Sequence, residues 1–215
     1  MPDSPDLARS AAAWCGHHLD DDQMARLSGY ADWLVTEAIP AGGLGPREAQ
    51  RVWGRHIADS LVFAAGWATS PVELLDVGTG VGLPGIPLAI LWPDTTVTVL
   101  DRGGRRIRLL TRAVRVLGLE NVQVAQGDVF DVAEEWHGLT FRGSVRAPEA
   151  VGLAARLLGV PGTAVLGLSR RAEPPDRTRD LIGVAEGLGM TAELIGVGAD
   201  ILDGPAWLLI MRLGV

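Results

Sequence analysis

The chain has 215 residues, with 19 basic and 26 acidic side chains, a formal net charge of -7 and 47% hydrophobic residues. All of the basic residues other than histidine are arginine. This length predicts one domain with at most a small extension, and the hydrophobic content excludes an intrinsically disordered chain. An acidic chain without lysine is also, as a whole, a poor match for a polyanionic partner.

The longest stretch without a charge, residues 77–93, contains four glycines and three prolines. Because these residues break a spanning helix, we predict no membrane segment. The acidic N-terminus has neither a basic region nor an apolar region of the secretory kind, so we expect no signal peptide. A single cysteine, Cys15, excludes an internal disulfide. Both features predict a cytoplasmic protein.

Residues 6–66 predict helices, because apolar side chains recur there near helical spacing. The acidic run at residues 20–22 is typical of a helix start. Residues 40–46 are rich in proline and glycine and divide the region into two helical parts. We therefore assign residues 1–66 to an N-terminal helical region and residues 67–215 to a second domain.

From residue 72 onward, short apolar runs alternate with longer segments of helical character. This rhythm is typical of an α/β protein with a mostly parallel sheet covered by helices. A turn signal at residues 202–205 separates the last two runs and predicts a C-terminal antiparallel hairpin. The runs that we assign to strands are residues 72–77, 96–100, 122–125, 163–168, 191–195 and 207–211.

The strongest local signal is the glycine-rich segment after the first of these strands, residues 74–87. Glycines let the backbone turn sharply and approach a ligand closely. The spacing of Gly80, Gly82 and Gly85 also satisfies a dinucleotide fingerprint. Asp76, however, lies two residues before the first glycine, where its charge would repel a pyrophosphate and favour a cationic ligand.

Two further strand ends carry groups that suit a nucleoside. Asp101 ends the second predicted strand, where a carboxylate can accept hydrogen bonds from both ribose hydroxyls. Residues 126–130 follow the third strand and offer an acceptor and backbone groups to an adenine edge. With the glycine loop, these positions favour S-adenosylmethionine over a nicotinamide dinucleotide, and tight turns of purely structural origin are the alternative.

Longer motifs are more specific than the glycine spacing. They are Arg-His-x-x-Asp-Ser at residues 55–60, Gly-x-Pro-Gly-Ile-Pro-Leu at 82–88, Asn-Val at 121–122, Val-Arg-Ala at 145–147 and Leu-Asp-Gly at 202–204. In this order they resemble the bacterial 16S ribosomal RNA guanine-N7 methyltransferase family, also named the glucose-inhibited division protein B family. The resemblance implies a Rossmann-like, S-adenosylmethionine-dependent methyltransferase domain in residues 67–215 that methylates N7 of a guanine in 16S ribosomal RNA.

The resemblance and the strand ends together give the expected site. The predicted cofactor-binding residues are Gly78, Gly80, Leu83, Asp101, Asp128, Val129, Phe130 and Arg146. Arg146, expected after the fourth strand, is also the candidate for positioning the reacting groups. Guanine N7 carries a lone pair at neutral pH, so no base is needed and catalysis rests on proximity and alignment.

A basic segment stands out in this acidic chain. Residues 102–115 contain six arginines and no acid, so the segment is +6 and the remainder, -7 minus 6, is -13. As a helix, the segment places Arg105, Arg108 and Arg112 on one ridge. We predict that these three contact substrate RNA, and an ordinary solvated helix face is the alternative.

Arg55 and His56 either face the RNA as well or make structural hydrogen bonds. Because His56, Asp59 and Ser60 lie within five residues and lack a nucleophile elbow, we exclude a hydrolytic triad. The histidines near Cys15 have no second cluster at ligand spacing, so we predict no metal site. The predicted partner is ribosomal RNA or the small ribosomal subunit, without a membrane.

The chain departs from the family at three places. Family members carry Asn-Leu-Thr where this chain has residues 42–44, a lysine-glycine pair where it has residues 168–169, and an arginine where it has Asp128. Each change removes a group that can hold RNA. A methyltransferase of a small molecule or another nucleic acid therefore stays an alternative, as does a non-catalytic cofactor-binding or ribosome-associated protein.

Overall fold

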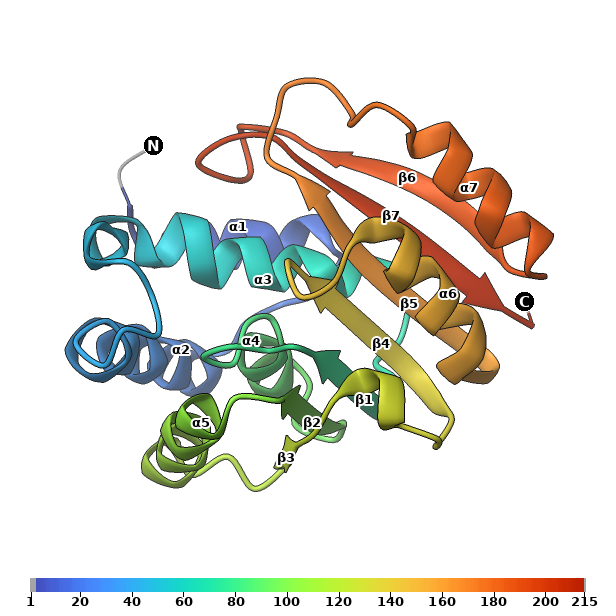
Figure 1. The fold of residues 1–215 in the computed structure, drawn as a ribbon. Coiled ribbons are helices and arrows are strands. Elements are labelled where there is room, and N and C mark those ends of the chain that lie inside the picture. The colour runs from blue at the N-terminus through green and yellow to red at the C-terminus, as the bar shows by residue number, and fades with distance from the viewer. Residues whose placement is uncertain (1–2, 215) are drawn as a thin grey trace.

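A seven-stranded sheet forms the centre of the computed structural model, which describes residues 3–214 (Figure 1). The strands are β1 (Glu73–Val77), β2 (Thr96–Asp101), β3 (Val122–Gln126), β4 (Trp136–Arg142), β5 (Leu158–Ser169), β6 (Thr191–Val197) and β7 (Ala206–Leu213). They lie in the order β3-β2-β1-β4-β5-β7-β6. The first five strands are parallel, and β7 runs antiparallel to both β5 and β6. The predicted mostly parallel sheet with a C-terminal antiparallel pair is confirmed.

The predicted helical character of residues 6–66 is also confirmed. The region comprises α1 (Asp6–Trp14), α2 (Asp21–Trp33), a π-helix (Leu34–Ala38), a 3-10 helix (Pro46–Arg51), a second π-helix (Val52–Ala58), α3 (Asp59–Leu61) and a 3-10 helix (Val62–Gly66). Asp20 caps α2, because its carboxylate accepts from the Gln23 N–H at 2.7 Å and the Gln23 side chain accepts from the Asp20 N–H at 3.0 Å. Turns at residues 39–45 break the region where proline and glycine predicted it.

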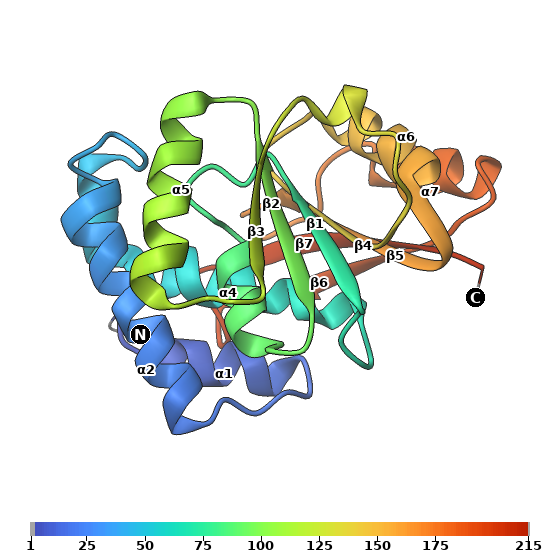
Figure 2. The ribbon, with the colours of Figure 1, turned by 90° about the horizontal axis from the view of Figure 1, so that it is seen from below.

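Helices cover both faces of the sheet. The later helices are α4 (Gly85–Leu91), α5 (Gly104–Leu117), α6 (Ala147–Leu157) and α7 (Thr178–Gly187), with a 3-10 turn at Val129–Asp131. The N-terminal helices lie with α4 and α5 on one side, and α6 and α7 lie on the other (Figures 1 and 2). Neighbouring residues of a strand point to opposite faces, so Leu74 belongs to the core on the first face and Leu75 to the core on the second.

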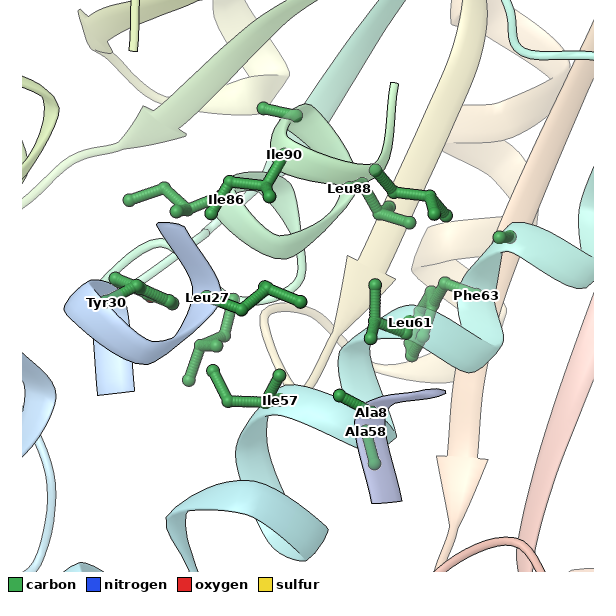
Figure 3. Packing of buried hydrophobic residues seen from close by; sticks show 14 of the residues in the cluster. Ala8, Leu27, Tyr30, Ile57, Ala58, Leu61, Phe63, Ile86, Leu88 and Ile90 are labelled. Carbon is green, nitrogen blue, oxygen red and sulfur yellow. The ribbon is translucent and has the colours of Figure 1, made fainter. Parts of the chain in front are cut away.

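The N-terminal helices share one core with the rest of the chain. Figure 3 shows Leu27 and Tyr30 of α2 and Leu61 of α3 packed toward Ile86 and Leu88 of α4. All five side chains are fully buried, and burial of such a side chain contributes about 1.5–3 kcal/mol. The predicted division between residues 66 and 67 stays a prediction, but the two regions stabilise each other through this packing.

None of the apolar runs that we assigned to strands corresponds to β4. This strand was implied only by the expectation that Arg146 follows a fourth strand. Its seven residues include His137, Gly138 and Thr140, so no apolar run marks it. Tertiary pairing decides its structure, because β4 lies between β1 and β5 in the centre of the sheet. No helix within residues 3–214 combines the length and the apolar character needed to cross a membrane.

Candidate functional site

The carboxyl ends of the parallel strands border a cavity of about 1040 Å³. The segments after β1 to β5, the start of β7 and residues 43–63 of the helical region contribute to its walls. Ligands of open α/β sheets bind at this edge, and pockets for single ligands measure roughly 300–1,000 Å³. The cavity is therefore large enough for a nucleoside cofactor together with part of a second molecule.

The loop after β1 has the backbone that its glycines predicted. Gly78, Gly80 and Gly82 have φ values of +65°, +66° and +107°, and residues with a side chain rarely adopt such positive values. A Cβ atom on Gly78 would lie 2.4 Å from the Ser144 side chain, whereas one on Gly80 would meet nothing within 4 Å. Gly80 therefore presents bare backbone to open space, and the predicted residue Leu83 lines the same cavity.

Asp76 does not face a ligand, and this corrects the interpretation of its charge. Its side chain is fully buried beneath the loop and does not line the cavity. One carboxylate oxygen accepts from the Gly85 N–H at 2.8 Å and the other from the Thr140 hydroxyl at 3.0 Å. Burial raises the pKa of Asp76 to about 6. Asp76 thus holds the start of α4 against the sheet.

Asp101 lies beside the glycine loop, as its position at a strand end predicted. Its two oxygens accept from the Gly80 N–H at 3.1 Å and the Gly103 N–H at 2.8 Å, and Arg106 approaches at 3.3 Å. A carboxylate has about four lone-pair sites, so one acceptor position remains. The sequence interpretation missed Arg106, because this arginine lies in the basic segment but off the predicted ridge.

The predicted residues after β3 also border the cavity. Asp128 accepts from the Phe130 N–H at 3.1 Å and so fixes the short 3-10 turn. Val129 is buried, whereas Phe130 is 58% exposed. An exposed aromatic ring at a cavity wall offers a face on which a planar ring can stack.

Two arginines, Arg142 at the end of β4 and Arg146 four residues later, lie in different environments. The side chain of Arg146 is 84% exposed and pairs with Glu149 at 2.6 Å, which raises the pKa of Arg146. The side chain of Arg142 is 15% exposed and donates to the Ser60 hydroxyl at 3.1 Å. Both arginines line the cavity, but only Arg142 is fixed by hydrogen bonds to buried groups of the protein. Because β4 carries no apolar run, no local sequence pattern pointed to Arg142.

Arg142 belongs to a cluster around one carboxylate, that of Asp59. Arg55, Arg142 and Arg170 lie 2.7, 2.9 and 2.6 Å from the Asp59 oxygens. Arg170 also pairs with Asp203, which precedes β7. The residues of this Asp59 cluster come from the second π-helix, α3, β4 and the segment after β5, so only folding brings them together.

His56 is neutral and has a structural contact. Its Nε2 lies 3.0 Å from the Glu48 carboxylate, and burial together with the charge of Arg142 lowers the pKa of His56 to about 4. The Ser60 hydroxyl donates to the His56 carbonyl at 2.6 Å and not to the ring. This geometry agrees with the exclusion of a hydrolytic triad. Within residues 3–214, no group of three or more histidine, cysteine, aspartate and glutamate side chains could hold a metal ion.

The predicted basic ridge lies on the exposed face of α5 and outside the cavity. Arg105 donates to the Ala41 carbonyl, and Arg112 pairs with Glu37 at 2.9 Å. Arg108 is exposed and has no ion pair in the described part of the chain. Two of the three ridge residues therefore tie α5 to the N-terminal region, and Arg106 is the residue of this helix that lines the cavity.

Solved structures share this fold. The chain matches the precorrin-6y C5,15-methyltransferase of Geobacter metallireducens with a TM-score of 0.56 and 16% identity, over 72% of this chain and 87% of that one. It matches Aeropyrum pernix fibrillarin, solved with bound S-adenosyl-L-methionine, with a TM-score of 0.52 and 19% identity, over 68% and 70% of the two chains. These likenesses show a Rossmann-like α/β fold, which the chain shares with a methyltransferase and with a protein that binds S-adenosyl-L-methionine.

The sequence comparisons give the family. Residues 23–173 match the model of the family described as rRNA small subunit methyltransferase G. The Mycobacterium marinum protein of that name is 36% identical over 192 residues, covering 86% of this chain and 82% of the relative. The Salinispora tropica protein is 32% identical over 210 residues, covering 94% and 84%. The chain belongs to the rRNA small subunit methyltransferase G family, which confirms the resemblance.

Proposed function

We propose that this chain transfers the methyl group of S-adenosylmethionine to N7 of a guanine in 16S ribosomal RNA. The observation that carries the proposal is one cavity with two different halves. The ends of β1, β2 and β3 supply bare backbone, a carboxylate and an aromatic ring, which suit a nucleoside. The ends of β4 and β5 supply arginines, which suit a polyanion. Membership of an rRNA methyltransferase family supports this substrate.

The nucleoside half fits the cofactor. Gly80 leaves open space where a side chain would stand, and Asp101 keeps an acceptor position for a ribose hydroxyl. Val129 and Phe130 would flank the adenine. For the cofactor carboxylate we propose Arg142, because its guanidinium is fixed inside the cavity, whereas Arg146 pairs with Glu149 on the surface. When bound, S-adenosylmethionine supplies a methyl group on a positively charged sulfur.

The residues around the reacting atoms are suited to alignment. Guanine N7 already has a lone pair, so no proton has to leave before transfer. The Nε2 atom of His56 is taken up by Glu48 and its Nδ1 atom is buried, and Asp59 is paired with three arginines, so neither residue is placed as a general base. Holding two reactants in line can supply on the order of several kcal/mol of the barrier.

The test has two steps. Calorimetry first measures S-adenosylmethionine binding, and absence of binding refutes the methyltransferase assignment. Labelled cofactor is then supplied with 30S subunits and with naked 16S RNA, both from cells that lack the N7 mark. Label in RNA at a guanine N7 supports the proposal. Cofactor binding without label in either RNA refutes the rRNA substrate and leaves the small-molecule and non-catalytic alternatives.

A further inference from the structure

The cavity has a net positive charge although the chain is acidic. Six arginines and four acidic residues line it, which gives six minus four, or +2. Near the cofactor half, Arg102 and Arg106 balance Asp101 and Asp128. At the rim, Arg146 and Glu149 form a pair. The whole +2 therefore belongs to the Asp59 cluster.

The Asp59 cluster is short of negative charge. The side chain of Asp59 is 8% exposed and neutralises one of its three arginines, whose side chains are only 15–32% exposed. Asp203 compensates part of the charge of Arg170 but also pairs with Arg51 at 3.4 Å. Partly desolvated guanidiniums without matching carboxylates favour an added anion. Arg55 uses Nη1 for Asp59, and its Nη2 has no hydrogen-bond partner within residues 3–214.

The position of Arg170 separates it from the cofactor half. Arg170 follows β5 directly, and β5 is two strands from β1 and three from β2. Neighbouring strands lie about 4.8 Å apart, so the end of β5 is about 10 Å from the glycine loop and about 14 Å from Asp101. A cofactor with its ribose at Asp101 and its carboxylate at Arg142, as proposed above, would leave the region beyond β5 to the other reactant.

We propose that Arg170 and Arg55 form a binding site for a phosphodiester of the substrate RNA, next to the target guanine. Planar guanidiniums bind phosphate oxygens through paired N–H donors. The site rests on the proposed function and identifies the contact that holds the substrate in the cavity.

The experiment compares Arg170→Gln with Arg171→Gln. Arg171 is the matched control, because it is the next residue, is exposed and has no ion pair in the described chain. Arg170→Lys and Arg55→Gln are measured beside them, and thermal unfolding confirms that each variant is folded. Binding of transcribed 16S RNA is measured at several salt concentrations, so that no turnover is needed, and calorimetry measures S-adenosylmethionine binding.

We expect Arg170→Gln and Arg55→Gln to weaken RNA binding about tenfold or more, since each loses a charge-assisted hydrogen bond. The slope of log affinity against log salt should become less steep by about 0.7 for each lost phosphate contact. Arg170→Lys should restore the slope, and cofactor affinity should stay that of the wild type. A purely structural role would not change the salt slope.

Three results would overturn the site. One is an Arg170→Gln variant that binds RNA like Arg171→Gln. Another is loss of cofactor affinity without loss of RNA affinity, which would assign Arg170 and Arg55, together with Arg142, to the cofactor carboxylate. The third is wild-type protein that does not bind RNA. If the wild type binds RNA without methylating it, the proposed function fails while the phosphate site can still be measured.

Discussion

Replacing Asp76 with asparagine keeps the shape of the side chain and removes its charge. The amide oxygen can still accept from the Gly85 N–H, and the amide nitrogen can donate to the Thr140 hydroxyl. Because Asp76 lies under the glycine loop and outside the cavity, we expect Asp76→Asn to bind S-adenosylmethionine like the wild type. If Asp76 instead faced the cationic cofactor, removing its charge would weaken binding.

The effect of Asp76→Asn on stability should depend on pH. The pKa of this carboxyl is about 6 in the folded chain, against 3.8 for an unperturbed aspartate. The folded state therefore holds the proton more tightly. The stability that protonation contributes is fully present below about pH 4 and is lost as the pH rises through about 6. Asparagine does not titrate, so the free energy of unfolding of Asp76→Asn relative to that of the wild type should rise by about 2 kcal/mol between about pH 4 and pH 7.

Urea unfolding at these two pH values measures the difference, with the m-value checked for a change in compactness. Asp94→Asn is the control, because Asp94 is exposed in the turn before β2. A stability difference between Asp76→Asn and the wild type that is the same at both pH values would refute the raised pKa. A loss of stability at pH 7 alone would show that the loop requires the charge itself.

Three further changes test the site and its support. Asp101→Asn should weaken S-adenosylmethionine binding about tenfold in calorimetry, because a ribose hydroxyl loses a charged acceptor, while Asp94→Asn should bind like the wild type. Gly85→Ala should lower the free energy of unfolding by about 1–3 kcal/mol in urea, since its Cβ would lie 2.8 Å from the buried Asp76 carboxylate. Tyr30→Phe should cost about 1–2 kcal/mol in the same assay, because the Val81 carbonyl loses its 2.9 Å hydrogen bond, and an unchanged midpoint would contradict this role.

Local sequence was sufficient to locate the residues that line the proposed cofactor half of the cavity. The glycine loop, Asp101 and residues 128–130 each follow directly from a strand whose apolar run is visible in the sequence. Parallel strands place their carboxyl ends at one edge, so these groups meet once the strands are known.

No apolar run of a strand indicated that the residues of the Asp59 cluster would meet. Arg55 and Asp59 precede the sheet, Arg142 ends a strand without an apolar run, and Arg170 follows β5. The expected residue, Arg146, lies four positions beyond the end of β4 and on the surface. The basic ridge was visible as a pattern, but helical periodicity cannot tell that Arg112 pairs with Glu37.

Short motifs and the periodicity of local structure were enough to establish the α/β class, the family and the turn of the glycine loop. Which way each charged side chain points, and which group it pairs with, depends on the tertiary structure. Asp76 faces the core because Gly85 and Thr140 offer it hydrogen bonds, and an acidic chain has a cationic cavity because segments far apart in sequence place three arginines on one carboxylate. Long-range packing fixes burial and pairing, and these two quantities set the electrostatics of the site.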